Sequence, residues 1–406
     1  MGSHVFAGLR GTGDFGDDER PKSFREMILW LNPNGRSPLT ALMSKMRSER
    51  VTDPEFSWWE ESLTLVRVET DAEANDSATT ISLDSGALQL VRGDVLLVEK
   101  DDDTDYTNEI VEVSETPSGD GEIAVSRGVA DTTAATIPSG AFLTRIGTSF
   151  AEGTGSPDVS QRNPKKQHNF CQIFKTAYEL TETVKETTFR TGDAKQNDRR
   201  RKSFDHAVSM ELAWLYGRAY ETTGDNGKPK RYTGGLRQFI RTNNKVFDPS
   251  ATSGKSEVTE DNFLDFVHKV FDHEGDNGGS DERLVLAGNE ALNTLNKLAR
   301  DSNSTRINFD GIVETYGMRL QRWIVPQGAF YVRTHPLLNT HGRYSSSMFI
   351  VDPANLVYRY LRDTKDQQGI QANDEDVEKG QWLTECGMEL HHEKTMAFIG
   401  RFKKNG

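Results

Sequence analysis

The sequence has little cysteine, little proline and no long apolar run. Its two cysteines, Cys171 and Cys386, are too few for a disulfide framework, and this count is typical of a protein made in a reducing compartment. No segment approaches the roughly 18 consecutive apolar residues of a membrane-spanning helix, and residues 1–20 lack the basic start and apolar core of a signal peptide. We therefore expect no membrane partner and no disulfide-stapled secreted domain.

Positive charge is also scarce. The chain of 406 residues carries 49 lysines and arginines against 62 acidic residues, which gives a formal net charge of −13. An overall field of this sign repels phosphates, so only a local basic cluster would bring the chain to nucleic acid. The sequence lacks an internal repeat, and its length suits two or three domains.

The N-terminal segment holds apolar side chains that have no local partner. Residues 1–22 are rich in glycine and acidic residues, which predicts a mobile arm. The helical patterns that follow are interrupted at 32–35, so they are too short to bury their apolar faces against each other. Phe24, Ile28 and Trp30 are therefore candidate contacts with a neighbouring chain.

An extended, β-rich region comes next. The adjacent residues Trp58 and Trp59 lie in an extended segment and are further candidate assembly contacts. Between residues 79 and 150, short β-branched runs alternate with glycine-containing turns at intervals of roughly 10–15 residues. This pattern predicts a small β-barrel or sandwich, inserted into a larger scaffold.

A long helix is predicted at about 196–220 from apolar residues spaced three to four apart. Its first turns carry Arg199, Arg200 and Arg201, although a helix N-terminus disfavours cations. A solvated face is the ordinary explanation of such a run, and contact with another subunit's carboxylates or with a nucleic-acid backbone is the functional one. From residue 259 the pattern becomes α/β. Thr259 is a candidate N-cap of a helix with Glu260 and Asp261 in its first turn. A polar loop is expected at 363–379.

No arrangement typical of a catalytic or cofactor site is found. Asp101, Asp103, Asp105 and Glu112 occupy the first, third, fifth and twelfth positions of a calcium loop, but a tyrosine stands where that loop needs glycine. An acidic hairpin tip is the favoured interpretation. A glycine pattern at 11–16 lacks the preceding strand of a nucleotide site, and the histidines show no ligand spacing. We therefore expect no cofactor, no metal and no enzymatic activity.

The order of these elements resembles the major capsid proteins of tailed bacteriophages with the Hong Kong-97 fold, in the subgroup with a β-domain insertion in the extended loop. The passages that carry the likeness are 90–95 and 125–134 in the β-rich region, 172–183, 202–220 and 232–236 around the long helix, 284–299 in the α/β region, and 382–402 near the end. Their order along the chain is more specific than any one of them.

The resemblance implies an α+β architecture of named parts. These are an N-terminal arm (1–49), an extended loop (50–168) with a β insertion domain at about 72–153, a peripheral domain (169–240) with a spine helix at about 196–222, an axial domain (241–380) and closing peripheral strands (381–406).

The function that the resemblance implies is that of a major capsid protein, which self-assembles into hexamers and pentamers of an icosahedral shell around the phage dsDNA genome. Implied partners are further copies of the chain, a portal, a decoration protein and non-specifically contacted DNA. A separate scaffolding protein is also implied, because the arm starts almost at Met1. Assembly would occur in the host cytoplasm, and the protein would reside in the virion.

Two alternatives remain open. The first is an encapsulin-type shell of a cellular compartment, although encapsulins generally lack a β insertion of this size. The second is a phage attachment or fibre protein with a carbohydrate-binding β domain, which should show repeats or coiled-coil heptads.

Overall fold

The computed structural model describes residues 47–404, except for 62–65, 100–107, 160–162, 190–191, 274–280, 302–308, 316–317 and 341; within 299–319 it describes the backbone alone. The chain divides into two compact units. Unit 1 consists of Met1–Ser57 and His168–Gly406, and unit 2 is Trp58–Gln167. Residues 72–153, the expected β insertion, fall within the sequence of unit 2.

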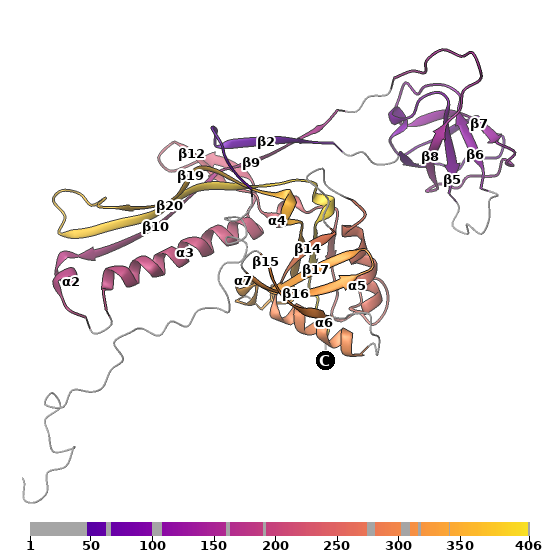
Figure 1. Ribbon diagram of the computed structural model, residues 1–406. Coiled ribbons are helices and arrows are strands. Elements are labelled where there is room, and N and C mark those ends of the chain that lie inside the picture. The colour runs from indigo at the N-terminus through magenta and orange to yellow at the C-terminus, as the bar shows by residue number, and fades with distance from the viewer. Residues whose placement is uncertain are drawn as a thin grey trace, which may run out of the picture. The chain divides into compact units, whose positions relative to one another are not determined.

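Unit 2 is built from antiparallel strands around an apolar core. The strands are β3 (Arg67–Glu69), β4 (Thr80–Ser82), β5 (Asp94–Val98), β6 (Ile110–Val113), β7 (Glu122–Val129) and β8 (Phe142–Thr148). They pair in the order β3-β8-β5-β6-β7-β4. Figure 1 labels β5, β6, β7 and β8 of this sheet. Alternate residues of β5 are buried, which is the pattern of a sheet with one face on a core.

The passage at 90–95 forms a buried turn before β5. Gly93 has a positive φ of 87°, a conformation that a residue without a side chain adopts freely. The carboxylate of Asp94 is fully buried, accepts a hydrogen bond from Val91 N at 2.9 Å and forms an ion pair with Arg145 at 2.9 Å. One side chain therefore closes the turn and joins it to β8.

Unit 1 contains an α/β sheet with its own core. Its strands are β13 (Asn244–Val246), β14 (Glu282–Ala287), β15 (Phe309–Thr315), β16 (Met318–Val325), β17 (Gly328–Thr334), β18 (Met348–Val351) and β21 (Ala397–Gly400). They pair in the order β13-β21-β18-β14-β17-β16-β15. The helices of this part are α5 (Glu260–Val267), α6 (Asn289–Asp301) and α7 (Pro336–Asn339).

The sequence signals for α5 are confirmed. Thr259 is the N-cap, and its Oγ1 accepts a hydrogen bond from Asn262 N at 3.2 Å. Two carboxylates lie in the first turn, where the positive end of the helix dipole stabilises their negative charge. The helix buries Phe263, whose ring stacks on that of Trp323 at 5.7 Å, so the helix covers the sheet.

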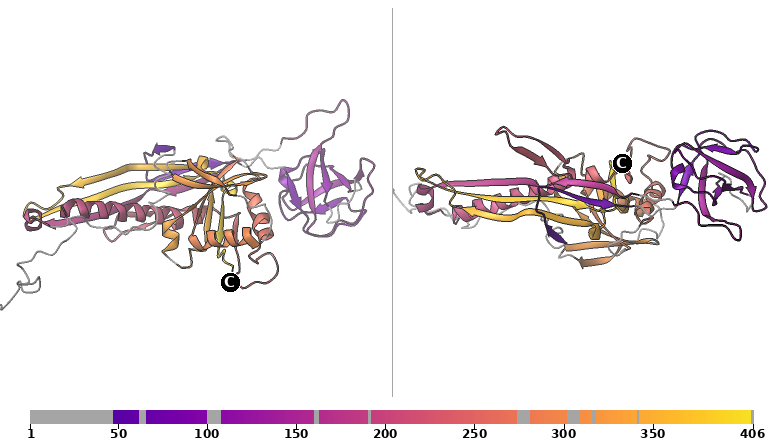
Figure 2. Two further views of the ribbon diagram at one scale, coloured as in Figure 1. Left: turned by 60° about the horizontal axis from the view of Figure 1, so that its bottom comes forward. Right: turned by 90° about the horizontal axis from the view of Figure 1, so that it is seen from above.

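A long sheet forms the other part of unit 1. Its strands are β1 (Ser48–Arg50), β19 (Leu356–Gln368), β20 (Val377–Leu390) and β10 (Gln172–Thr181), paired in the order β1-β19-β20-β10. The short helix α2 (Glu182–Glu186) follows β10, and the long helix α3 (Ala194–Tyr216) runs along the sheet (Figures 1 and 2). The predicted long helix is therefore present, and at 23 residues it is about 34 Å long.

The loop expected at 363–379 is shorter than predicted. It is confined to the turn 369–376, because β19 and β20 extend as a hairpin that β10 supports along one edge. β19 belongs to the long sheet, whereas β21 pairs with β18 and β13 of the α/β sheet. The chain changes sheets at the 3₁₀ turn Pro353–Asn355, where Asp352 caps the backbone.

Two further pairs of strands complete the description. β2 (Glu55–Glu60) pairs with β9 (Lys165–Phe170), and the chain passes between the two units along these strands. β11 (Tyr220–Thr223) pairs with β12 (Pro229–Tyr232) in a hairpin that precedes α4 (Leu236–Phe239). Within the described ranges, no helix has the length and apolarity needed to cross a membrane.

Candidate assembly surfaces

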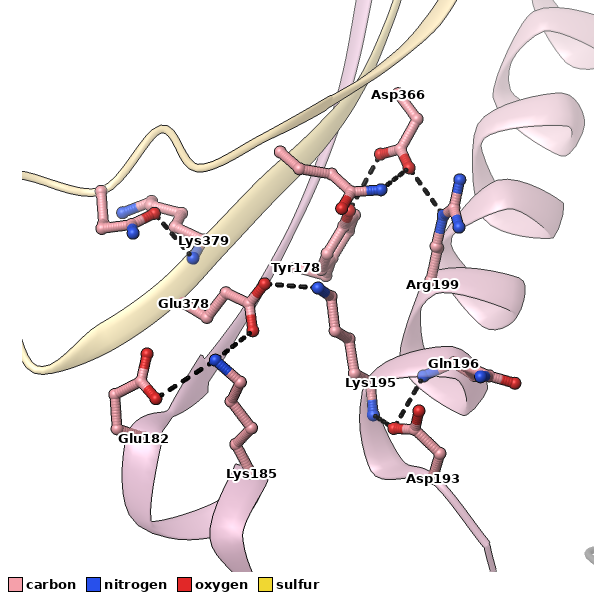
Figure 3. Close-up of polar contacts among 12 residues, drawn as sticks. Tyr178, Glu182, Lys185, Asp193, Lys195, Gln196, Arg199, Asp366, Glu378 and Lys379 are labelled. Atoms are coloured by element: carbon pink, nitrogen blue, oxygen red, sulfur yellow. Dashed lines mark hydrogen bonds and ion pairs between the residues drawn. The ribbon is translucent and has the colours of Figure 1, made fainter.

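An ion-pair cluster fastens the start of α3 to the far end of the long sheet (Figure 3). Lys195 of α3 forms an ion pair with Glu378 of β20, and Lys185 of α2 lies 3.6 Å from the same carboxylate. The hydrogen bond from Lys195 lowers the pKa of Glu378 below its ordinary value. Because one acidic side chain joins two helices to the sheet, this end of unit 1 is held as one piece.

Arg199 belongs to the same interface. Its Nε lies 2.6 Å from the Asp366 carboxylate, which also accepts a hydrogen bond from the Tyr178 hydroxyl at 2.9 Å (Figure 3). Burial, and then the neighbouring Asp366, raise the pKa of Tyr178 to about 12. Arg199 therefore forms an ion pair within its own chain. From the sequence, a contact with another subunit or with nucleic acid was the functional alternative for this residue.

The other two arginines of the run are more exposed. Arg201 lies 3.6 Å from Asp198 one turn earlier on α3, a spacing typical of a surface pair. Arg200 is exposed as well. For Arg200 and Arg201, the prediction that they meet another subunit or nucleic acid stays a prediction.

The two tryptophans of β2 lie in different environments. Trp58 is only 7% exposed, and its Nε1 donates a hydrogen bond to Glu60 at 2.8 Å. Trp59 is 65% exposed, because successive side chains of a strand point to opposite faces. Of this pair, Trp59 has the large apolar surface that an assembly contact needs.

Several predicted site residues fall outside the described residues. These are Phe24, Ile28 and Trp30 of the N-terminal segment and Asp101, Asp103 and Asp105 of the calcium-like spacing. Glu112 is described: it lies in β6 and pairs across the sheet with Val95. Among the described residues, no group of three or more His, Cys, Asp or Glu is placed to hold a metal ion.

A buried polar joint connects α3 to the α/β sheet. Glu211 of α3 and His335, which directly follows β17, are both fully buried, and Glu211 Oε1 lies 2.8 Å from His335 Nε2. The two residues are 124 positions apart in the sequence. Sequence reasoning missed them, since nothing in either local pattern indicates the partner.

Sequence reasoning also missed a groove at the opposite end of α3 from the ion-pair cluster. The groove measures about 730 Å³, and its lining includes Leu212, Tyr216, Tyr220 and Tyr232. Leu212 and Tyr220 are 42% and 61% exposed. The available signal is the short run 220–223 before a Gly-Asp-Asn-Gly turn, a pattern that predicts a hairpin.

Comparison with known proteins decides between the classes that the sequence left open. The model of the SU10 major capsid protein family matches residues 8–403, nearly the whole chain. This chain belongs to that family. It is thus a phage major capsid protein, a component of the virion, and neither an encapsulin nor an attachment fibre.

Individual relatives of this capsid protein are distant. It is 26% identical to the "Major capsid protein" of Pseudomonas phage PaMx41 over 422 residues, which cover 98% of this chain and 97% of the relative. The structure is similar to that of Mycobacterium phage Bobi, with a TM-score of 0.47, 8% identity and coverage of 96% of this chain and 97% of the other. For Mycobacterium phage Adephagia the TM-score is 0.46, with 8% identity and 96% of each chain covered.

The fold of this capsid protein has the elements that the Hong Kong-97 resemblance implied. The long helix α3 follows a β-rich region and precedes an α/β sheet, and the chain returns to the long sheet through β19 and β20. The predicted α+β class is confirmed.

Proposed function

We propose that this major capsid protein self-assembles into hexamers and pentamers that form an icosahedral shell around the phage dsDNA genome. The family match over residues 8–403 is the observation that carries the proposal. Exposed apolar side chains on the described surface support it, since a subunit completed by its neighbours exposes such groups when alone. The proposed role is structural, with no catalytic step and no cofactor.

The proposal assigns parts of the chain to parts of the assembly. The extended loop, about 50–168, would lie across an adjacent subunit, and its β insertion would project from the shell. The arm, 1–49, would contribute Phe24, Ile28 and Trp30 to contacts between subunits, and Arg200 and Arg201 would meet carboxylates or DNA phosphates.

Further partners belong to the same proposal. A separate scaffolding protein would direct assembly, a portal would occupy one vertex, and a decoration protein would bind the outside. The net charge of −13 supports a weak, non-specific relation to packaged DNA, because most of the subunit repels phosphates.

Adjacent tryptophans allow a test with a matched control. Trp59→Ala removes an exposed side chain, so we expect the subunit's free energy of unfolding to change by less than about 0.5 kcal/mol while assembly is impaired. Trp58→Ala removes a buried one and should destabilise the subunit by about 3 kcal/mol. Shells are counted by negative-stain electron microscopy, and stability is measured by urea unfolding.

The outcomes separate assembly from folding. Normal shells from Trp59→Ala would remove Trp59 from the proposed interface while leaving the capsid assignment in place. A wild-type chain that stays monomeric with and without a scaffold would contradict self-assembly itself.

A further inference from the structure

The β11–β12 hairpin is held in place by close backbone contacts at its base. At its base Gly235 N donates to Gly217 O at 3.0 Å, and an added Cβ at Gly217 would collide with the carbonyl oxygens of Ala213 and Thr233. At its tip Gly224 N donates to Lys228 O at 2.8 Å. In the described part of the chain, β11 and β12 pair only with each other, and an isolated hairpin gains stability when a partner covers it.

One face of this hairpin continues the groove beside α3. Tyr220 pairs across the strands with Tyr232, and Thr222 with Lys230, so alternation places these four side chains on the same face. Tyr220 and Tyr232 also line the groove, and Lys230 Nζ lies 5.4 Å from the Tyr232 ring. An aromatic surface with a cation at its edge is suited to a partner segment that is both apolar and acidic.

Residues 218–231 carry four cations and two carboxylates, Glu221 and Asp225, so the charges of this segment are only partly balanced within it. Arg218, Lys228 and Lys230 are exposed, and none of them forms an ion pair with another described residue. Arg231 is the exception, since it pairs with Glu221 at 2.5 Å. In a chain with a net charge of −13, this positive region attracts other copies of the same chain.

The turn between β19 and β20 has the complementary chemistry. Residues 369–376 expose Ile370, which is 40% accessible, followed by Asp374, Glu375 and Asp376. Within the described ranges these three carboxylates have no ion-pair partner, whereas the nearby Glu378 already has two lysines. The turn therefore offers one apolar side chain and three carboxylates that form no ion pair with any lysine or arginine of the described ranges.

The turn cannot reach the groove of its own subunit. Lys195, in the first turn of α3, pairs with Glu378 next to the turn, whereas Leu212 and Tyr216, in the last turns, line the groove. The helix between them is about 34 Å long and packs along the sheet (Figure 1). We propose that the groove and the β11–β12 hairpin of one subunit bind the 369–376 turn of a second copy.

Such a contact is head-to-tail. The two surfaces differ, and each subunit carries one of each, so repetition of the contact produces closed rings or extended arrays. This inference rests on the proposed self-assembly and adds to it the two surfaces that meet.

Crosslinking in a mixture tests the contact directly. Subunits carrying Lys230→Cys and subunits carrying Glu375→Cys are purified separately, mixed, assembled with scaffold and treated with a short bismaleimide. Cys171 and Cys386 are both buried, so the native thiols give little background. We expect a covalent dimer in the mixture and none in either single preparation, with the crosslinked peptide identified by mass spectrometry.

A charge exchange gives an independent readout. Lys230→Glu should raise the subunit concentration needed for assembly by about fivefold or more, and adding Glu375→Lys should restore most of the loss. Because both side chains are exposed, unchanged thermal unfolding of the subunits is the folding control.

The results distinguish the contact from the function. Normal shells without the mixed crosslink, or a dimer in the Lys230→Cys preparation alone, overturn this contact while the capsid assignment stands. A crosslink from Lys230→Cys to another segment or to the scaffold overturns it as well. A wild-type chain that forms no shells in the same conditions overturns both.

Discussion

Glu109 and Arg127 form the most enclosed ion pair among the described residues of unit 2, and removing it should have a large, specific effect. The two side chains are 1% and 7% exposed, and they bind in a two-pronged arrangement, with Nε–Oε1 at 2.6 Å and Nη2–Oε2 at 2.7 Å. The carboxylate also accepts hydrogen bonds from Gly128 N and Ala135 N, each at 3.1 Å. Glu109 therefore fixes both β7 and the turn that follows it.

Glu109→Gln leaves a buried guanidinium without its counter-charge and weakens the acceptor for two backbone N–H groups. Breaking a buried pair in this way costs about 3–5 kcal/mol, which for a unit of this size lowers the melting temperature by roughly 12 °C or more. Glu99→Gln is the matched control: Glu99 pairs with Arg67 in the same unit, but these side chains are 34% and 48% exposed, so the loss should be under about 1 kcal/mol.

The effect should depend on pH in a defined direction. Burial opposes ionisation of Glu109, but hydrogen bonds from Arg127, Ala135 and Gly128 outweigh it, so the pKa of Glu109 lies below its ordinary value. A lowered pKa stabilises the folded state above the unfolded carboxyl's pKa of about 4.3, and this stabilisation is lost as the pH falls below that value. The difference between wild type and Glu109→Gln should therefore be constant near neutrality and shrink in acid.

Differential scanning calorimetry of the unassembled subunit, from pH 7 down to pH 3, is the assay. A loss below about 1 kcal/mol for Glu109→Gln, equal to that for Glu99→Gln, would refute the reasoning that burial decides the contribution of the pair.

Two further predictions concern unit 1. Glu211→Ala leaves His335 Nε2 buried without this partner and should lower the free energy of unfolding by about 3–5 kcal/mol in urea titrations. Glu211→Gln keeps a hydrogen-bonding group, so its free energy of unfolding should fall clearly less. Equal decreases for the two variants would argue against the hydrogen bond. Burial raises the pKa of Cys171 to about 12 and also raises the pKa of Cys386. A thiol reagent at pH 8 should therefore label neither cysteine until the subunit is denatured. Rapid labelling of the native subunit would contradict the buried placement of these two side chains.

Local patterns were sufficient where the element's own side chains decide its structure. The spacing of apolar residues predicted α3, and the Thr259 cap predicted the start of α5, because both signals act within a few residues. The passage at 125–134 carries part of the family likeness, and the structure gives a role to its arginine, since Arg127 forms the buried pair with Glu109.

Local patterns failed where a distant segment supplies the support. Residues 363–379 are polar and resemble a loop, yet both ends of this range form strand. β10 pairs with β20, and Tyr178 packs against Gly380, where an added Cβ would collide with its ring. Arg199 likewise looked like an unmatched cation, since its partner Asp366 is far along the chain. Contacts of this kind are created by the fold and leave no spacing to detect.

The path of the chain through β2 and β9 bears on whether unit 2 can be exchanged. The chain enters and leaves unit 2 along strands that pair with each other, so the two ends of this unit lie close together. A replacement domain with similarly close ends would close the same short span at little cost in chain entropy. We therefore expect that a foreign domain grafted at this junction leaves the strand register of unit 1 unchanged.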